Sequence, residues 1–339
     1  ALLLACWLVI YVLLRNHERQ EMLNYLQQRD KQLNKMMAIN LDRLTSLRND
    51  LDNFKYDLKS NYLQKMLDQM NPSRKSAIVY DLNRRFNESQ RIYDSIHCVR
   101  TPTIVVNTTL CIHNPKKDVQ VSGVVFEHGV YEKEVLTEFM SHLSKYPDAL
   151  VVDIGANIGQ YSLFAAKNKN YVIAVEPVYS NLLRMHKASQ MENTTDYITL
   201  LANAVSNERQ QVRVVQSEQT SYGLPSLDRV DILTEEASAY TKEMLVNTIT
   251  FNDLIDYVPQ EYKARIPRAI VKIDVSGYES VALLKAERFF NLIEVSAIFI
   301  DWLKLKENSF LIGNLVDKML RFLNSYELNA YSLNNTQLK

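Results

Sequence analysis

The feature that most constrains this chain is a pair of short apolar segments that each end in an acidic residue. The first reads LVV and ends at Asp153, and a loop with Gly155 and Gly159 leads from it into a segment whose apolar residues have helical spacing. The second reads YVIAV and ends at Glu176. This order of strand, loop, helix and strand predicts a βαβ unit of a parallel sheet. Both acids then lie at the carboxyl edge of the sheet, where open α/β sheets bind ligands.

The loop between the two strands limits which ligand this edge can bind. Gly155 and Gly159 allow the backbone to turn tightly and to approach a ligand closely. Glu176 has the position of an acid that accepts hydrogen bonds from the two hydroxyls of a ribose. The third glycine of the dinucleotide fingerprint is missing, and the chain has no Gly-x-x-x-x-Gly-Lys sequence. The pattern therefore favours a nucleoside and disfavours both a nicotinamide-dependent oxidoreductase and a nucleoside triphosphate site.

Seven motifs, in this order along the chain, resemble those of one known family. They are GVYE at 129–132, DIGANIG at 153–159, EP at 176–177, NAVS at 203–206, TITFNDL at 248–254, VKIDVSGYE at 271–279 and IFIDW at 298–302. As a set they resemble the FkbM-type methyltransferases, over about residues 120–335.

The resemblance implies a class I methyltransferase fold, which is an α/β fold with a doubly wound, mostly parallel, seven-stranded Rossmann-like sheet and helices on both faces. It also implies methyl transfer from S-adenosyl-L-methionine, usually to oxygen, and we expect a small molecule or a glycan as the acceptor. By the same resemblance, the loop after the first strand holds the methionine half of the cofactor, an acid holds its ribose, and an asparagine lies at its adenine. The cofactor-binding candidates are Asp153, Gly155, Asn157 and Gly159 in the loop, then Glu176 and Asn203.

The resemblance places catalysis at the acids that follow the strand 269–273. Transfer to a hydroxyl needs a group that removes or orients its proton. Asp274 is the first candidate for this base and Glu279 the second. In the alternative interpretation, Asp274 caps a helix that begins near Gly277. Lys272, inside the apolar strand, needs a partner acid or a route to solvent.

Among several departures from the family pattern, two change a carboxylate. Ser276 and Asp301 each stand where the family usually has glutamate, so one carboxylate is lost and another is shortened. These changes favour a second hypothesis, in which the domain is catalytically degenerate and acts as an oligomeric membrane interaction module. The intact loop after Asp153, together with Glu176, favours the enzyme.

The N-terminus predicts a membrane segment. Residues 1–14 (ALLLACWLVIYVLL) carry no charge, although a membrane-spanning helix needs about 20 apolar residues. We interpret them as part of a signal anchor, which predicts a single-pass membrane protein of an endomembrane such as the Golgi or the ER. A cleaved signal peptide and a buried apolar helix are the alternatives.

Residues 15–70 have the pattern of a coiled coil. They contain no proline or glycine, and most positions of a seven-residue repeat are apolar. The repeat positions are Leu23, Leu26, Asp30, Leu33, Met37, Asn40, Leu44, Leu47, Leu51, Phe54, Leu58 and Asn61. The pattern predicts a stalk that forms a homo-oligomer, and a long single helix packed on the globular domain is the alternative.

The connector 71–125 precedes the methyltransferase domain, 126–339. It is rich in β-forming residues, and we expect strands at 103–106 and 119–126. Cys98 and Cys111 lack the spacing of a zinc site, so no metal is expected; they form either a disulfide or two buried thiols. Four Asn-x-Ser/Thr sequences occur, about as many as the composition gives by chance, at Asn87, Asn107, Asn193 and Asn334.

The charge balance excludes one class of partner. The chain has 39 Lys+Arg against 39 Asp+Glu, which gives a formal net charge of zero over 339 residues. A strongly basic protein that binds nucleic acid by neutralising phosphates is therefore excluded.

Overall fold

The computed structural model describes residues 77–83, 93–217, 226–228, 241–263, 268–302 and 309–331, together with seven separate residues between 24 and 44. The chain divides into two compact units, Ala1–Pro72 and Ser73–Lys339.

In the first unit, the seven described residues are all helical and exposed. Most positions of the expected coiled coil, and the whole of the expected membrane segment 1–14, lie outside the described residues. In the part of the chain that is described, no helix has the length and apolar character needed to cross a membrane.

The second unit is built on a six-stranded sheet in the order β1-β6-β5-β4-β11-β12. The strands are β1 (Val79–Tyr80), β4 (Leu150–Ile154), β5 (Val172–Val175), β6 (Ile198–Leu201), β11 (Arg268–Ile273) and β12 (Glu294–Ile300). Neighbouring strands are parallel from β6 to β12, whereas β1 pairs with β6 antiparallel. The central strands are mostly apolar, as is typical of strands covered on both faces, and Asp153 in β4 and Lys272 in β11 are buried exceptions.

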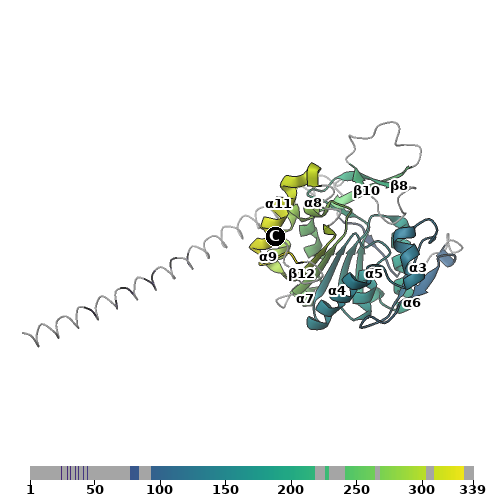
Figure 1. The fold of residues 1–339 in the computed structure, drawn as a ribbon, viewed down its shortest axis with the longest axis horizontal. Helices are drawn as coiled ribbons and strands as arrows, with labels where there is room; N and C mark the ends of the chain where they lie inside the picture. The colour runs from purple at the N-terminus through teal and green to yellow at the C-terminus, as the bar shows by residue number, and fades with distance from the viewer. Residues whose placement is uncertain are drawn as a thin grey trace, which may run out of the picture. The chain divides into compact units, whose positions relative to one another are not determined.

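Helices cover both faces of this sheet, as Figure 1 shows. On one face, α4 (Lys133–Lys145), α5 (Gln160–Lys167) and α6 (Tyr179–Glu192) pack on alternate strand residues such as Val151. On the other, η4 (Phe251–Tyr257), α8 (Glu279–Ala282), η5 (Leu283–Lys285), α9 (Glu287–Leu292) and α11 (Ser309–Ser325) pack on the residues between them, such as Val152. The predicted α/β fold with a largely parallel central sheet is confirmed.

Two smaller sheets complete the unit. One has the order β7-β10-β8-β9, from β7 (Ala204–Val205), β8 (Gln211–Ser217), β9 (Ser226–Asp228) and β10 (Thr241–Ile249). The other pairs β2 (Cys98–Arg100) with β3 (Thr109–Cys111), where a disulfide joins Cys98 to Cys111. The short helices α7 (Gln260–Lys263) and η2 (Thr195–Tyr197) lie in connections.

The structure corrects two expectations about the strands. The main sheet has six strands within the described ranges, and one of them is the antiparallel β1 from the connector. Residues 103–106 contain only an isolated bridge between Ile104 and Val106. The segment expected as a strand at 119–126 is helical, as the π-helix η1 (Val119–Gly123) and α3 (Val124–His128). The physical reason is Asp118, whose carboxylate accepts hydrogen bonds from the first backbone N–H groups of this helix.

Candidate functional site

A cavity lies at the carboxyl ends of β4, β5 and β11, the edge at which the sequence predicts ligand binding. Five segments supply most of its lining, namely 131–132, 153–158, 175–177, 203–205 and 274–276. Parallel strands bring their carboxyl ends to one edge, so residues far apart in the sequence converge there. Of the predicted site residues, Asp153, Gly155, Asn157, Glu176, Asn203 and Asp274 line this cavity.

The loop after β4 is shaped by its glycines. Gly155 has a φ of +76°, and a Cβ atom added there would lie 2.0 Å from the backbone oxygen of Asp274. Only glycine allows so close an approach of the two loops. Gly159 has a φ of +86° and precedes α5; a Cβ there would lie 2.7 Å from the Met185 side chain.

Asp153, at the cavity wall, holds the first turn of α5. Its Oδ2 accepts hydrogen bonds from the backbone N–H of Ser162, at 3.1 Å, and from the Ser162 hydroxyl, at 2.6 Å. The side chain is almost completely buried, and this burial raises the pKa of Asp153 to about 6. Removal from water disfavours the charged carboxylate and raises its pKa, whereas the hydrogen bonds from Ser162 and the charge of Lys272 partly offset this rise.

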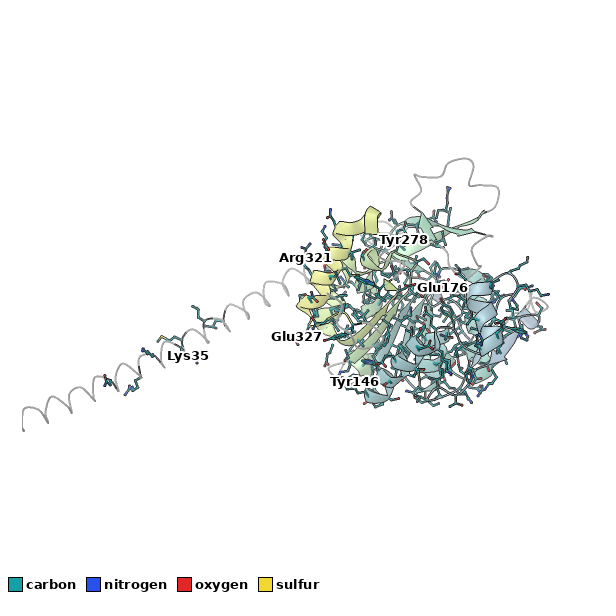
Figure 2. The ribbon with its side chains drawn as sticks, viewed as in Figure 1. Lys35, Tyr146, Glu176, Tyr278, Arg321 and Glu327 are labelled. Atoms are coloured by element: carbon teal, nitrogen blue, oxygen red, sulfur yellow. A yellow bond between two sulfur atoms is a disulfide. The ribbon has the colours of Figure 1, made fainter. Side chains whose placement is uncertain are left out.

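Glu176, which is labelled in Figure 2, is buried, and its carboxylate is held on both oxygens. Oε2 accepts from the backbone N–H of Asn157 at 2.8 Å; Oε1 accepts from the N–H of Val178 at 2.8 Å and from Asn181 Nδ2 at 3.2 Å. Burial raises the pKa of Glu176 to about 7, against the opposing effect of these three donors. Glu176 therefore ties the loop after β4 to the start of α6.

A buried histidine orients the asparagine beside Glu176. His113 Nε2 lies 2.6 Å from Asn181 Oδ1. Because Asn181 Nδ2 donates to Glu176, its Oδ1 is the acceptor, and the network assigns the proton to His113 Nε2. Burial lowers the pKa of His113 to about 4, so the ring is neutral at physiological pH. His113, which follows the disulfide strand β3, thus positions Glu176 through Asn181.

The two predicted asparagines occupy the cavity wall in different ways. Asn157 has a left-handed φ of 53°, a conformation that asparagine tolerates better than most residues. Asn203 uses its side chain to join strands: Oδ1 accepts from the N–H of Ile78 at 2.7 Å, and Nδ2 donates to the backbone oxygen of Asn247 at 3.1 Å. Its amide holds together the wall that the resemblance assigns to adenine.

Asp274 forms an ion pair with Lys272, and this pair compensates the buried charge of the lysine in strand β11. Lys272 Nζ lies 3.2 Å from Asp274 Oδ2 and 5.2 Å from the centre of the Tyr161 ring. Burial works against the charged form of Lys272, but Asp274 and other nearby carboxylates outweigh it and raise the pKa of its ammonium. Helix α8 begins at Glu279, and its N-cap residue, Tyr278, makes no side-chain capping hydrogen bond.

Glu279 does not line the cavity. It is completely buried, and its Oε1 accepts hydrogen bonds from the N–H groups of Val275, at 3.1 Å, and Gly277, at 3.0 Å. Burial raises the pKa of Glu279. These bonds hold the loop in which Ser276 has a left-handed φ of 55° and Gly277 a φ of 95°. Glu279 is therefore placed to shape the loop that carries Asp274, and the geometry favours Asp274 as the group that faces a ligand.

Sequence reasoning assigned no role to several residues that complete the cavity. Glu132 has a left-handed φ of 47° and accepts a hydrogen bond from the Tyr161 hydroxyl at 3.1 Å. The Gln160 side chain bonds to both the N–H and the oxygen of Tyr131, each at 2.7 Å. Burial, reinforced by Glu132, raises the pKa of both tyrosines. The GVYE motif at 129–132 marks this segment in the sequence. Its contacts with Gln160 and Tyr161 of α5 are tertiary, so the sequence alone does not place it at the cavity.

The charges that line the cavity are mainly negative. Glu132, Asp153, Glu176 and Asp274 are acidic, and Lys272 is the basic side chain among the lining residues. Such a wall favours a ligand that carries positive charge, and apolar residues such as Ile154 and Val205 give flat contact surface beside it. Within the described ranges, no group of His, Cys, Asp and Glu side chains is arranged to hold a metal ion.

Comparison with known proteins gives one family. The family model of the methyltransferase FkbM domain matches residues 153–331. A solved structure, methyltransferase FkbM from Methylobacillus flagellatus KT, is 17% identical over 44% of this chain, with a TM-score of 0.28. The match spans 32% of that protein's own length. A search of curated proteins gave no match.

Proposed function

Because the chain belongs to the FkbM methyltransferase family, we propose that it transfers a methyl group from S-adenosyl-L-methionine to an oxygen atom of a small molecule or glycan. The observation that carries this proposal is the cavity at the ends of β4, β5 and β11, with Glu176 on one side and the Asp274–Lys272 pair on the other.

The donor set of the cavity suits this cofactor. S-adenosyl-L-methionine supplies an electrophilic methyl group on a positively charged sulfonium, and the excess of acidic side chains favours that charge. Glu176 is the acid for the ribose hydroxyls, because a carboxylate accepts more hydrogen bonds than the three it receives from the protein. The loop 153–159 and the wall at Asn203 would hold the methionine half and the adenine.

Asp274 is the residue that removes or orients the proton of the acceptor hydroxyl. Methyl transfer needs donor and acceptor held in line, and a hydroxyl acceptor must lose its proton. Lys272 cannot take that proton, because neighbouring carboxylates hold its ammonium protonated. Its charge instead orients the Asp274 carboxylate, while the bonds of Glu279 to the backbone fix the loop.

The rival proposal is a domain that has lost catalysis and acts as an oligomeric membrane interaction module. Its support is Ser276, which lines the cavity at a position where the family usually has a carboxylate. The two proposals differ in whether any methyl group is transferred.

The experiment compares Asp274→Asn with wild type, using labelled S-adenosyl-L-methionine and a membrane or secretory extract as acceptor. Loss of the carboxylate should lower methyl transfer by about 10² to 10⁴. Asp256→Asn, the same change at an exposed residue of η4 outside the cavity lining, should leave the rate unchanged. A wild-type protein that binds cofactor but transfers no methyl group to any fraction supports the rival.

A double variant separates catalysis from structure. Asp274→Asn leaves the Lys272 ammonium buried without its ion-pair partner, which costs about 3 to 5 kcal/mol in comparable cases. Lys272→Gln with Asp274→Asn removes both charges. If Asp274 acts on the acceptor, the double variant stays inactive; recovery of activity would show that Asp274 serves only to neutralise Lys272.

We also propose that the protein is anchored in an endomembrane by residues 1–14 and forms a homo-oligomer through the stalk 15–70. The apolar seam supports the oligomer. Replacing Leu44, Leu47 and Leu51 by polar residues should then convert the protein to monomers in light scattering. A wild-type protein that is already monomeric would contradict the coiled coil.

A further inference from the structure

The disulfide between β2 and β3 indicates the compartment of the second unit. Cys98 and Cys111 are directly opposite in an antiparallel pair, and their sulfur atoms are bonded. Structural disulfides form and persist in oxidising compartments, such as the lumen of the secretory pathway. The same compartment attaches glycans to Asn-x-Ser/Thr sequences, which by count alone carry little information in this chain.

One of these sequences has the geometry of an accessible acceptor. Asn193, followed by Thr194 and Thr195, is the C-cap of α6, is exposed, and has left-handed φ and ψ of 53° and 48°. Its N–H bonds to the Gln190 oxygen at 3.3 Å, and that of Thr194 bonds to the Ser189 oxygen at 3.0 Å. These bonds close the turn through the backbone, so the Asn193 side chain takes no part in it. We propose that Asn193 carries an N-linked glycan.

The residue before Asn193 fixes this turn to the rest of the unit. Glu192 accepts hydrogen bonds from Thr109 Oγ1 at 2.6 Å and from Lys167 Nζ at 2.6 Å, and it also pairs with Arg100. Burial raises the pKa of Glu192, but the hydrogen bonds from Lys167 and Thr109 and the charges of Lys167 and Arg100 outweigh it and lower the pKa overall. The end of α6 is thus attached to the β2–β3 pair, and Asn193 presents its amide from a fixed position on the surface.

Asn107, the other described member of the set, differs from Asn193. It is half-buried, its Oδ1 accepts from Arg100 Nη2 at 2.5 Å, and its Nδ2 lies 3.4 Å from Thr103 Oγ1. The threonine that completes its sequence, Thr109, is buried against Glu192. A glycan on Asn107 would have to replace these contacts. Asn87 and Asn334 lie outside the described residues.

The modification is a transfer from a lipid-linked oligosaccharide diphosphate. The bond between the anomeric carbon and the diphosphate oxygen breaks, a bond from that carbon to Asn193 Nδ2 forms, one amide proton is released, and the lipid diphosphate leaves. The glycan does not obstruct the cavity. Glu176 lies before the first turn of α6 and Asn193 after its last, and 14 helical residues span about 20 Å.

The test expresses the whole chain, preceded by an initiator methionine, in cultured animal cells. A glycosidase that cleaves N-linked glycans and converts the modified asparagine to aspartate is applied in heavy-oxygen water. We expect the peptide that contains residue 193 to carry the labelled aspartate. Asn193→Gln should migrate faster than wild type on a gel by one glycan, and enzyme treatment should remove that difference.

Thr195→Ala and Thr195→Ser give the matched comparison. Both shorten the same side chain, but only serine preserves the acceptor sequence, so the alanine variant should lose the glycan and the serine variant should keep it. An unmodified residue 193 in wild-type protein overturns the proposal. Free thiols at Cys98 and Cys111 in intact cells, detected by alkylation, overturn its premise about the compartment.

Discussion

Replacing Glu176 by glutamine keeps the shape of the side chain and makes it resemble the protonated acid. Burial raises the pKa of Glu176 from 4.5 to about 7, so the folded protein holds this proton more tightly than the unfolded chain does. Between those two values the folded state binds the extra proton. The free energy of unfolding of the wild type therefore falls as pH rises through this window, and Glu176→Gln should not show this part of the fall.

The magnitude follows from the interval between the two pKa values. At about 1.4 kcal/mol for each pH unit, the charged Glu176 destabilises the folded state by up to about 3 kcal/mol above pH 7. The stability difference between Glu176→Gln and wild type should thus shift in favour of the variant by up to about 3 kcal/mol between about pH 4 and about pH 8. A constant cost is added at every pH, because the amide NH2 group replaces one of the two oxygens that accept from a backbone N–H. Asp153 gives both proteins a pH dependence of the same sign, and its charge also helps to raise the pKa of Glu176, so that part of its effect is lost in Glu176→Gln.

The same variant should lose affinity for the cofactor. Hydrogen bonds to a charged acceptor contribute about 1.5 to 3 kcal/mol, so S-adenosyl-L-methionine should bind at least about tenfold more weakly. Urea denaturation across this pH range measures the stability, and calorimetry measures the affinity. Glu261→Gln, at an exposed position of α7, is the control and should change neither. A stability difference that does not vary with pH, or an unchanged affinity, would refute the reasoning.

Further substitutions test the glycine loop of the site and the disulfide between β2 and β3. Gly155→Ala places a Cβ against the Asp274 backbone at a positive φ, whereas the Cβ of Gly159→Ala meets a flexible methionine. Gly155→Ala should therefore lower the midpoint of thermal unfolding more than Gly159→Ala does. Equal effects would contradict the close approach of the two loops. Replacing Cys98 and Cys111 by serine should cost about 3 kcal/mol of stability in denaturant titrations, because it releases a loop with a sequence separation of 13; equal stability with and without reductant would contradict this.

The centre of the site could be predicted because its signals are local. The strand, the loop and the helix are specified by residues close together in the sequence. These are an apolar run that ends at Asp153, a pair of glycines, and a second apolar run that ends at Glu176. Parallel pairing of β4 with β11 then brings the loop that carries Asp274 to the same edge of the sheet. The backbone N–H of Asp274 donates to the backbone oxygen of Ile154 at 3.0 Å.

Two other features were not predicted from the sequence, for different physical reasons. The side chain of Asn203 is held by Ile78 and Asn247, which are 125 and 44 residues away in the sequence. The segment after Asp118 looks like a strand because valine recurs in it, but a capping carboxylate and burial against the core make it helical. In this segment a local cap together with burial overrides the β propensity of valine.

Binding of S-adenosyl-L-methionine to the purified chain, measured by isothermal titration calorimetry, tests the central claim most directly. We expect saturable binding to one site, which weakens as pH falls below about 7, because protonation of Glu176 removes the acceptor charge. Glu176→Gln should abolish this pH dependence in the same range. A folded wild-type protein that shows no saturable binding at any pH would contradict the claim that this cavity is a methyl-donor site.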